Sequence, residues 1–320
     1  MTIDTEPPCK EESAAAISAK MRQHAFPDSR FQHDISKFIP GFDGSDVAAQ
    51  GVIQELAYRR AQYLFVTPDN ALIPFRQCAV RDGKTMVLPS YGLHRGFLLL
   101  DPKKVPRGHE KYAAWLDGVE HFGYSVTLGE LQRRGRFDLV VLGASAVNAA
   151  GLRFGMGHRY LDIEWGIFAQ IGVVDDDVPI ATIIHDTQYT TAKLPIESSD
   201  ILVDIIATPT GIWRTPSRPR PSTLNWALVD SAIEDSPPLR ELRESGLNGT
   251  QRPSVLLEGF QAKWKRAFPY DSNVECSTGR CFWPKATPVR RSRESAASIY
   301  TRAGHRITWR RQPKKSPKHR

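Results

Sequence analysis

One stretch, residues 138–164, constrains the fold of this 320-residue chain more than any other (DLVVLGASAVNAAGLRFGMGHRYLDIE). It opens with the apolar run 139–142, which is typical of a strand buried on both faces of a parallel sheet, although so short a run also fits a buried helix. Small residues and glycines follow, and over about residues 159–170 the apolar spacing becomes helical. A strand, a glycine loop and a helix in this order present backbone N–H groups and a positive helix end to an anion.

The residue types in the glycine loop predict a phosphate and magnesium site. Gly155 and Gly157 allow a positive φ and a close approach of ligand to backbone, and Arg153 offers a planar fork for phosphate oxygens. Asp162, in the first turn of the predicted helix, could hold Mg²⁺ while phosphates supply other ligands. The alternative is that the glycines form a tight turn, Arg153 is solvated and Asp162 complements the helix dipole. We expect Asp162→Asn to cost under ~1 kcal/mol of stability.

Apolar runs alternate with helical patterns along most of the chain, which favours a parallel α/β sheet. The predicted strands are residues 63–66, 85–88, 97–100, 139–142, 179–184 and 200–208. The predicted helices cover residues 13–25, 47–57, 68–80, 109–116 and 159–170, with a last one over 224–242 that is interrupted at Pro237-Pro238.

Polar residues follow two of the predicted strands at their carboxyl ends, where open α/β sheets place their sites. His185-Asp186-Thr187-Gln188 follows residues 179–184, and Thr208 ends the run 200–208. A lone histidine such as His185 is more often structural than catalytic. Lys20 and Arg22 lie on the predicted helix 13–25, where they either cover a phosphate ligand or are solvated helix charges.

The net charge of +8 comes from the C-terminal part of the chain. Residues 285–320 contain twelve Lys or Arg and one acid, Glu294, whereas the remaining residues hold 31 bases and 34 acids. A basic surface on the folded part is therefore not implied. The tail either makes weak, salt-dependent contacts with RNA or another polyanion, or it serves as a solvating or targeting segment.

Composition also limits the cellular compartments in which we expect this protein. No run approaches the ~20 apolar residues of a membrane span, and the first residues, MTIDTEPPCKEES, are too polar for a signal peptide. The four cysteines are too scattered for a disulfide framework, and Cys276 and Cys281 lack a second ligand pair for zinc. We therefore expect a cytoplasmic protein without a membrane partner.

Several spaced motifs resemble the 5-formyltetrahydrofolate cyclo-ligase (methenyltetrahydrofolate synthetase) family. They are Arg153-Phe-Gly155-Met-Gly157-His-Arg-Tyr160-Leu-Asp162 and the run from Leu194 to Thr208, which follows a strand ending near Gln188. The chain is similar above all to the cyclo-ligase-like domain of the methenyltetrahydrofolate synthetase domain-containing branch. That branch shares Asp162-x-Glu164, His185-Asp186-x-Gln188 and Thr208-Pro209-Thr210. The resemblance also includes residues 39–45 and 218–221 and covers about residues 15–245.

The resemblance implies a single Rossmann-like three-layer α/β domain with a mostly parallel sheet, of the sugar-phosphate isomerase and CoA-transferase type, over residues 13–245. Residues 1–12 and the basic tail 246–320 are expected to be disordered. The implied cofactors are ATP and Mg²⁺. In this family ATP phosphorylates the formyl oxygen of 5-formyltetrahydrofolate, N10 attacks, and loss of phosphate gives 5,10-methenyltetrahydrofolate.

The resemblance also assigns site residues. By carry-over, the catalytic residues are Arg153 and Tyr160, Asp162 binds the metal, and the nucleotide contacts are Lys20, Arg22, Arg153, Gly155, Gly157, Gln188 and Thr208. The family pattern is Arg-x-Gly-x-Gly-x-Gly-Tyr-Tyr-Asp, but here Arg159 replaces the third glycine and Leu161 replaces one tyrosine. The enzymes also carry a lysine four residues before an arginine; if Arg22 is that arginine, Ser18 takes the lysine's place and only Lys20 could substitute.

These departures leave two alternatives open. One is a non-catalytic cyclo-ligase-like protein that binds nucleotide, RNA or a protein partner, although the aromatic-rich signature of an RNA-recognition domain is absent from the sequence. The other is an ATP- or phosphosugar-using enzyme with a different acceptor.

Overall fold

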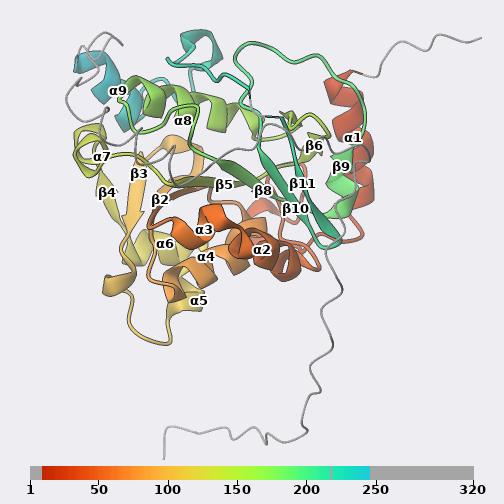
Figure 1. The fold of residues 1–320 in the computed structure, drawn as a ribbon, viewed down its shortest axis with the longest axis horizontal. Helices are drawn as coiled ribbons and strands as arrows, with labels where there is room; N and C mark the ends of the chain where they lie inside the picture. The colour runs from red at the N-terminus through yellow and green to blue at the C-terminus, as the bar shows by residue number, and fades with distance from the viewer. Residues whose placement is uncertain (1–8, 217, 246–320) are drawn as a thin grey trace, which may run out of the picture. The chain divides into compact units, whose positions relative to one another are not determined.

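An eight-stranded sheet forms the centre of the computed structural model, which describes residues 9–216 and 218–245 (Figure 1). Its strand order is β11-β10-β8-β5-β1-β2-β3-β4. The five strands from β10 to β2 are mutually parallel, while β11, β3 and β4 join through antiparallel pairs. The strands are β1 (Tyr63–Val66), β2 (Thr85–Pro89), β3 (Phe97–Leu100), β4 (Tyr124–Val126), β5 (Leu139–Gly143), β8 (Ile180–Ile183), β10 (Ile205–Thr208) and β11 (Gly211–Arg214).

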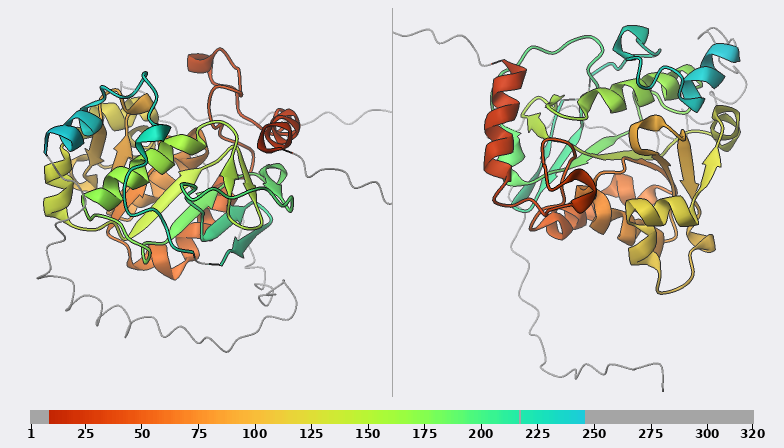
Figure 2. Two further views of the ribbon diagram at one scale, coloured as in Figure 1. Left: turned by 90° about the horizontal axis from the view of Figure 1, so that it is seen from above. Right: turned by 180° about the vertical axis from the view of Figure 1, so that it is seen from behind.

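A small second sheet continues from the carboxyl ends of β5 and β8. It has the order β7-β6-β9, in which β6 directly follows β5 and β9 comes shortly after β8. Helix α1 (Lys10–Met21) lies beside this sheet and contacts β7 (Figure 2). The three strands are β6 (Ala146–Asn148), β7 (Arg153–Phe154) and β9 (Tyr189–Thr190).

Helices cover both faces of the main sheet, which gives three layers (Figures 1 and 2). Alternation along each strand separates the two apolar cores: in β1, Leu64 and Val66 pack on the side of α2 and α4, and Phe65 packs against Phe168 of α8. One face carries α2 (Ser45–Gln54), α3 (Leu56–Arg60), α4 (Ile73–Arg81), α5 (Glu110–Ala113) and α6 (Leu116–Phe122); the other carries α7 (Leu128–Arg134), α8 (His158–Gln170) and α9 (Pro237–Glu244).

The predicted fold class, a three-layer α/β domain with a mostly parallel sheet, is confirmed, and so is the strand, glycine loop and helix order of residues 138–164. Strands β4 and β11 were not predicted. Helix α1 begins at Lys10 rather than at residue 13, so residues 10–12 are helical and not disordered.

Two predicted elements were wrong. In the run 200–208 only Ile205–Thr208 is a strand, because Ile201, Leu202 and Val203 are buried in an irregular segment. The helix predicted over 224–242 is a 3-10 turn at Trp226–Leu228 followed by α9. The prolines start α9 instead of interrupting a longer helix, since a proline is well accommodated in the first turn.

Several predictions concern residues outside the described part. They are the disorder of residues 1–8, the basic tail 246–320 with its RNA contact, and the cysteine pair Cys276 and Cys281. The described residues all belong to one of two compact units, which spans residues 1–256. None of the helices within residues 9–216 and 218–245 has the length and hydropathy that a membrane span requires.

Candidate active site

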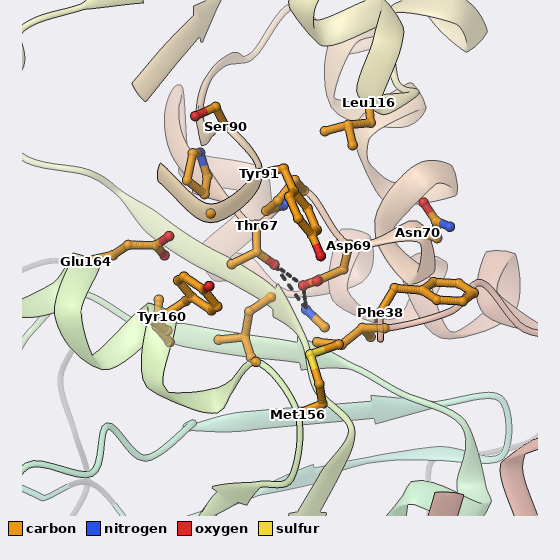
Figure 3. Close-up of a pocket in the computed structure, with 18 of the residues that line it drawn as sticks. Phe38, Thr67, Asp69, Asn70, Ser90, Tyr91, Leu116, Met156, Tyr160 and Glu164 are labelled. Carbon is orange, nitrogen blue, oxygen red and sulfur yellow. Dashed lines mark hydrogen bonds between the residues drawn. The ribbon is translucent and has the colours of Figure 1, made fainter. Parts of the chain in front are cut away.

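A partly open cavity lies at the carboxyl ends of β1, β2 and β5 (Figure 3). This edge is where open parallel sheets place ligands, and the aromatic side chains in the lining, which include Tyr91 and Tyr160, suit a ligand with a flat ring system. The segments after β1 and β2 form part of the wall, and one face of α8 forms another part through Gly157, Tyr160, Leu161 and Glu164. The cavity also includes Arg153, so it adjoins the glycine loop.

Asp69 provides a carboxyl group at the floor of this cavity. Its Oδ2 accepts hydrogen bonds from the Thr67 hydroxyl and from the Gly143 N–H, the latter at 3.0 Å (Figure 3). Burial raises the pKa of Asp69, while these two bonds oppose that rise. The fully buried Arg76 fixes the loop by donating to the carbonyls of Thr67 and Asp69, each at 2.9 Å.

The glycine loop has the backbone geometry that an anion site requires. Gly155 and Gly157 adopt positive φ values of 86° and 80°, and α8 begins at His158 without a side-chain cap. The Tyr160 N–H donates to the Gly157 carbonyl at 3.2 Å, so the first-turn N–H groups that can reach a ligand are those of His158 and Arg159. Gly155 also allows α1 to approach, because an added Cβ would lie 3.3 Å from the Cβ of Ala14.

Arg153 and Asp162 form an ion pair that holds the loop against α8. Both side chains are 4% exposed, and Arg153 Nη2 donates to Asp162 Oδ1. Arg153 also donates to the carbonyls of Ile201 and His158 at 3.0 Å each, and the Ile201 N–H donates to Asp162 at 3.2 Å. Burial raises the pKa of Asp162, and the guanidinium of Arg153 opposes that rise. The alternative in which Arg153 is solvated was therefore wrong.

Asp162 offers one carboxylate that a magnesium ion could share with phosphates, and its Oδ1 already accepts from Arg153 and from the Ile201 N–H. Asp162 lines a separate pocket with Ser198 and Ser199, whereas Asp200 Oδ2 accepts from Lys10 Nζ at 3.2 Å and from the Glu197 N–H at 2.8 Å. Nucleotide-bound Mg²⁺ commonly takes one or two carboxylates and completes its shell with phosphate oxygens and water. Within the described residues no group of three or more His, Cys, Asp or Glu could hold a metal, so a site built from protein ligands alone is not formed there.

Gln188 and Thr208 lie at neighbouring strand ends, as predicted, and both are buried. Gln188 Nε2 donates to the carbonyls of Ala144 and Ser145 at 2.7 and 3.2 Å, so this side chain supports the connection from β5 to β6. The Thr208 hydroxyl donates to Asp186. These contacts position backbone around the loop, and a nucleotide contact by either side chain stays a prediction.

The other predicted residues divide into two groups. Tyr160 lines the cavity together with Arg153 and Gly157, and the residue is 40% exposed. Lys20 and Arg22 are exposed on and just after α1, and neither side chain makes a hydrogen bond or an ion pair within residues 9–216 and 218–245. The structure thus brings Arg153, Gly157 and Tyr160 together at the cavity, whereas Asp162 contacts Arg153 but lines a separate pocket.

Three residues of this region were not predicted as site residues: Asp69, Glu164 and Asp200. Asp69 follows strand β1, and the rule that selected Gln188 after β8 would also have selected it. Glu164 lies one helical turn after Tyr160 and therefore on the same face of α8. Asp200 directly precedes the buried segment 201–203 and forms an ion pair with Lys10 at 3.2 Å.

The sequence is similar to known proteins of one family. A sequence model of the 5-formyltetrahydrofolate cyclo-ligase family matches residues 18–209. The chain is similar to the methenyltetrahydrofolate synthase domain-containing protein of Homo sapiens, at 33% identity over 220 residues, which cover 67% of this chain and 56% of that protein. The same-named protein of Mus musculus is 31% identical over 247 residues, which cover 73% of this chain and 65% of that protein. The chain thus spans somewhat over half the length of these relatives.

A solved structure is also similar to the chain. It is the NMR structure of the 5,10-methenyltetrahydrofolate synthetase of Aquifex aeolicus, with a TM-score of 0.41 at 16% identity, covering 64% of this chain and 92% of that chain. The family match spans more than half of the sequence, from the second half of α1 through β10. The chain belongs to the 5-formyltetrahydrofolate cyclo-ligase family.

Proposed function

We propose that this protein converts 5-formyltetrahydrofolate to 5,10-methenyltetrahydrofolate with ATP and Mg²⁺. The observation that carries the proposal is the junction of two sites: the cavity that suits a ring system shares Arg153 and Gly157 with the glycine loop. A phosphate held by the loop and a ring held in the cavity would meet at this junction. Proximity of two bound reactants is the main contribution that a protein makes to a phosphoryl transfer.

The chemistry requires a leaving group on the formyl carbon. ATP would supply a phosphoryl group to the formyl oxygen, and attack by N10 with loss of the N10 proton and of phosphate would close the ring. The loop would bind phosphate oxygens through the N–H groups of Gly157 and the first turn of α8. Asp162 would hold Mg²⁺, Lys20 and Arg22 would screen phosphate charge, and Tyr160 would orient the acceptor.

A direct assay tests this function. The full-length protein is mixed with ATP, Mg²⁺ and 5-formyltetrahydrofolate, and the absorbance of methenyltetrahydrofolate is followed, with an ATP-omitted control. Product that depends on ATP supports the proposal and shows that Arg159 and Leu161 are compatible with catalysis. Absence of product, with ATP binding still measurable by calorimetry, would favour the second candidate.

The second candidate is a non-catalytic domain that binds nucleotide or a protein partner. One observation favours it: Nε, Nη1 and Nη2 of Arg153 all donate to protein groups. An arginine whose donors are already bound to protein groups has fewer free donors to stabilise the charge that develops in a transition state. In this case ATP would bind to the loop N–H groups, and turnover would be absent.

We expect the double variant Lys20→Ala, Arg22→Ala to bind ATP about 10-fold more weakly or worse, because two charge-assisted contacts to phosphate are lost. Stability should stay unchanged, since both side chains are exposed. Calorimetric titration with Mg-ATP measures the affinity. The matched control is Lys103→Ala, Arg107→Ala, which removes two exposed cations beyond β3 at the opposite edge of the sheet. Equal affinities for both double variants would remove the end of α1 from the nucleotide site.

A further inference from the structure

A stacked pair of histidines joins the end of α1 to the carboxyl end of β8. The rings of His24 and His185 have centroids 4.1 Å apart and planes inclined by 24°. Phe42 packs edge-on against the His185 ring, with centroids 5.6 Å apart. Both histidines are half-buried. The His185 ring therefore lies between the segment that follows α1 and the segment that precedes α2.

Further contacts fix the same junction. The Thr187 hydroxyl donates to Sδ of Met21, the last residue of α1, at 3.6 Å. The Asp43 N–H donates to the His24 carbonyl at 3.2 Å. The start of α1 is anchored independently, because Lys10 forms ion pairs with two acidic residues of the segment 197–200. The histidine pair therefore secures the end of the helix.

The hydrogen bonds of His185 require a neutral imidazole. Its Nδ1 accepts from the backbone N–H of Thr187 at 3.2 Å and lies 2.9 Å from the hydroxyl of the same residue. A backbone N–H can only donate, so Nδ1 carries a lone pair here. Protonation would place an N–H donor opposite another N–H donor and would add positive charge against the ring of His24.

The surroundings of His185 oppose its protonation as well. Burial has the largest effect and lowers the pKa of His185, and His24 acts in the same direction. Asp186, in the 3-10 turn that follows, and Asp43, before α2, act in the opposite direction. A free imidazole has a pKa near ~6.5. Since the pKa is lower in the folded protein, the junction is fully stabilised above ~6.5 and loses that stabilisation as the pH falls through the folded pKa.

We propose that His185 is a positioning residue whose neutral imidazole holds the end of α1 against the sheet, and whose protonation releases it. The segment that is held carries Lys20 and Arg22, the two cations expected to meet the nucleotide. In this respect alone the inference rests on the proposed function. Docking of the end of α1 would then weaken in acid, and the start of the helix would stay in place.

Hydrogen exchange of the full-length protein without nucleotide tests the inference. Protection is the exchange rate relative to an unstructured peptide at the same pH, and mass spectrometry of overlapping peptides measures it. Between pH 7.5 and 5.5 we expect the protection of residues 20–26 to fall about 3- to 10-fold, because release binds one additional proton. Residues 14–17, nearer the end that Lys10 anchors, should change less. This comparison needs wild-type protein alone.

Two variants assign the pH response to one histidine. His185→Asn keeps an acceptor for the Thr187 N–H and does not titrate, so residues 20–26 should change less than about 2-fold with pH. The matched control is His33→Asn, which removes an exposed histidine at a φ of 61° that asparagine tolerates. This control should keep the full response. An equal response along the whole of α1, or a full response in His185→Asn, would overturn the inference.

Addition of Mg-ATP to the wild type at pH 7.5 separates the inference from the proposed function. If Lys20 and Arg22 bind phosphate, the nucleotide should raise the protection of residues 20–26. A pH response without this nucleotide effect would overturn only the contact of the two cations with ATP. A nucleotide effect without a pH response would overturn only the role of His185.

Discussion

Replacing Asp162 by asparagine is expected to lower the free energy of unfolding by about 3–5 kcal/mol, because it leaves the buried guanidinium of Arg153 without a counter-charge. Both side chains are 4% exposed, so water cannot replace the lost carboxylate. The variant also weakens the acceptor that binds the Ile201 N–H. This expectation differs from the small effect predicted for a carboxylate in an exposed first helical turn, because the structure buries Asp162.

Urea denaturation of the variant and the wild type measures this difference. The matched control is Asp175→Asn, which breaks the ion pair between Asp175 and Arg136. In this pair the side chain of Arg136 is 32% exposed and that of Asp175 is 39% exposed. Exposed ion pairs contribute about 0–1 kcal/mol, so the control should unfold almost like the wild type. Similar losses in the two variants would show that Asp162 is not required as a buried counter-charge. The affinity of Asp162→Asn for Mg-ATP is therefore measured without urea, under conditions in which the variant is folded. Only then does a reduced affinity report on the nucleotide site.

Much of the fold could be predicted because the signals are local. Continuous apolar runs such as 139–142 identify the central strands, and the glycines before His158 mark the start of α8. Strands β4 and β11 were missed because each lies at an edge of the sheet, where apolar burial is incomplete: β11 alternates between intermediate and exposed residues. An edge strand with this pattern is hard to tell from a loop by composition.

The ion pair and hydrogen bonds that hold Arg153 could not be predicted from the sequence. Its partners Ile201 and Asp162 lie 48 and 9 residues away, and Ile201 belongs to an apolar run that looks like a strand. The run is buried because it crosses the β6–β7 hairpin, and only the folded chain shows that crossing. A motif therefore identified the right residues, but it did not distinguish a phosphate ligand from a residue that supports the loop.

The same limit applies to Glu164. Helical periodicity places it on the face of Tyr160, but it does not show that Oε2 of this buried side chain has no hydrogen-bond partner among the described residues. A missing partner depends on everything that surrounds a side chain, including Asp69 from a distant strand end. Sequence can therefore propose which residues share a face, whereas the unsatisfied group that points to a ligand emerges only from the packed structure.

Replacing Gly151 by alanine should lower the free energy of unfolding by about 2–5 kcal/mol, from left-handed strain and from overpacking. Gly151 has a φ of 83°, and an added Cβ would lie 2.4 Å from the carbonyl oxygen of Val203. The Val203 N–H in turn donates to the Gly151 carbonyl at 3.0 Å. Alanine would push the segment 201–203 away from the hairpin, and with it the backbone of Ile201 that binds both Arg153 and Asp162.

Gly172→Ala separates the two causes, because Gly172 has a similar φ of 76° and an added Cβ there meets nothing within 4 Å. This control should cost only the backbone strain, about 1–2 kcal/mol. The excess loss in Gly151→Ala, measured by urea denaturation, then reports the clash with Val203. Equal losses in the free energy of unfolding would mean that the segment 201–203 moves away from the added Cβ without destabilising the fold. In that case the ion pair of Arg153 and Asp162 would not depend on the contact between Gly151 and the segment 201–203. The contribution of the ion pair to stability would then be measured by Asp162→Asn alone.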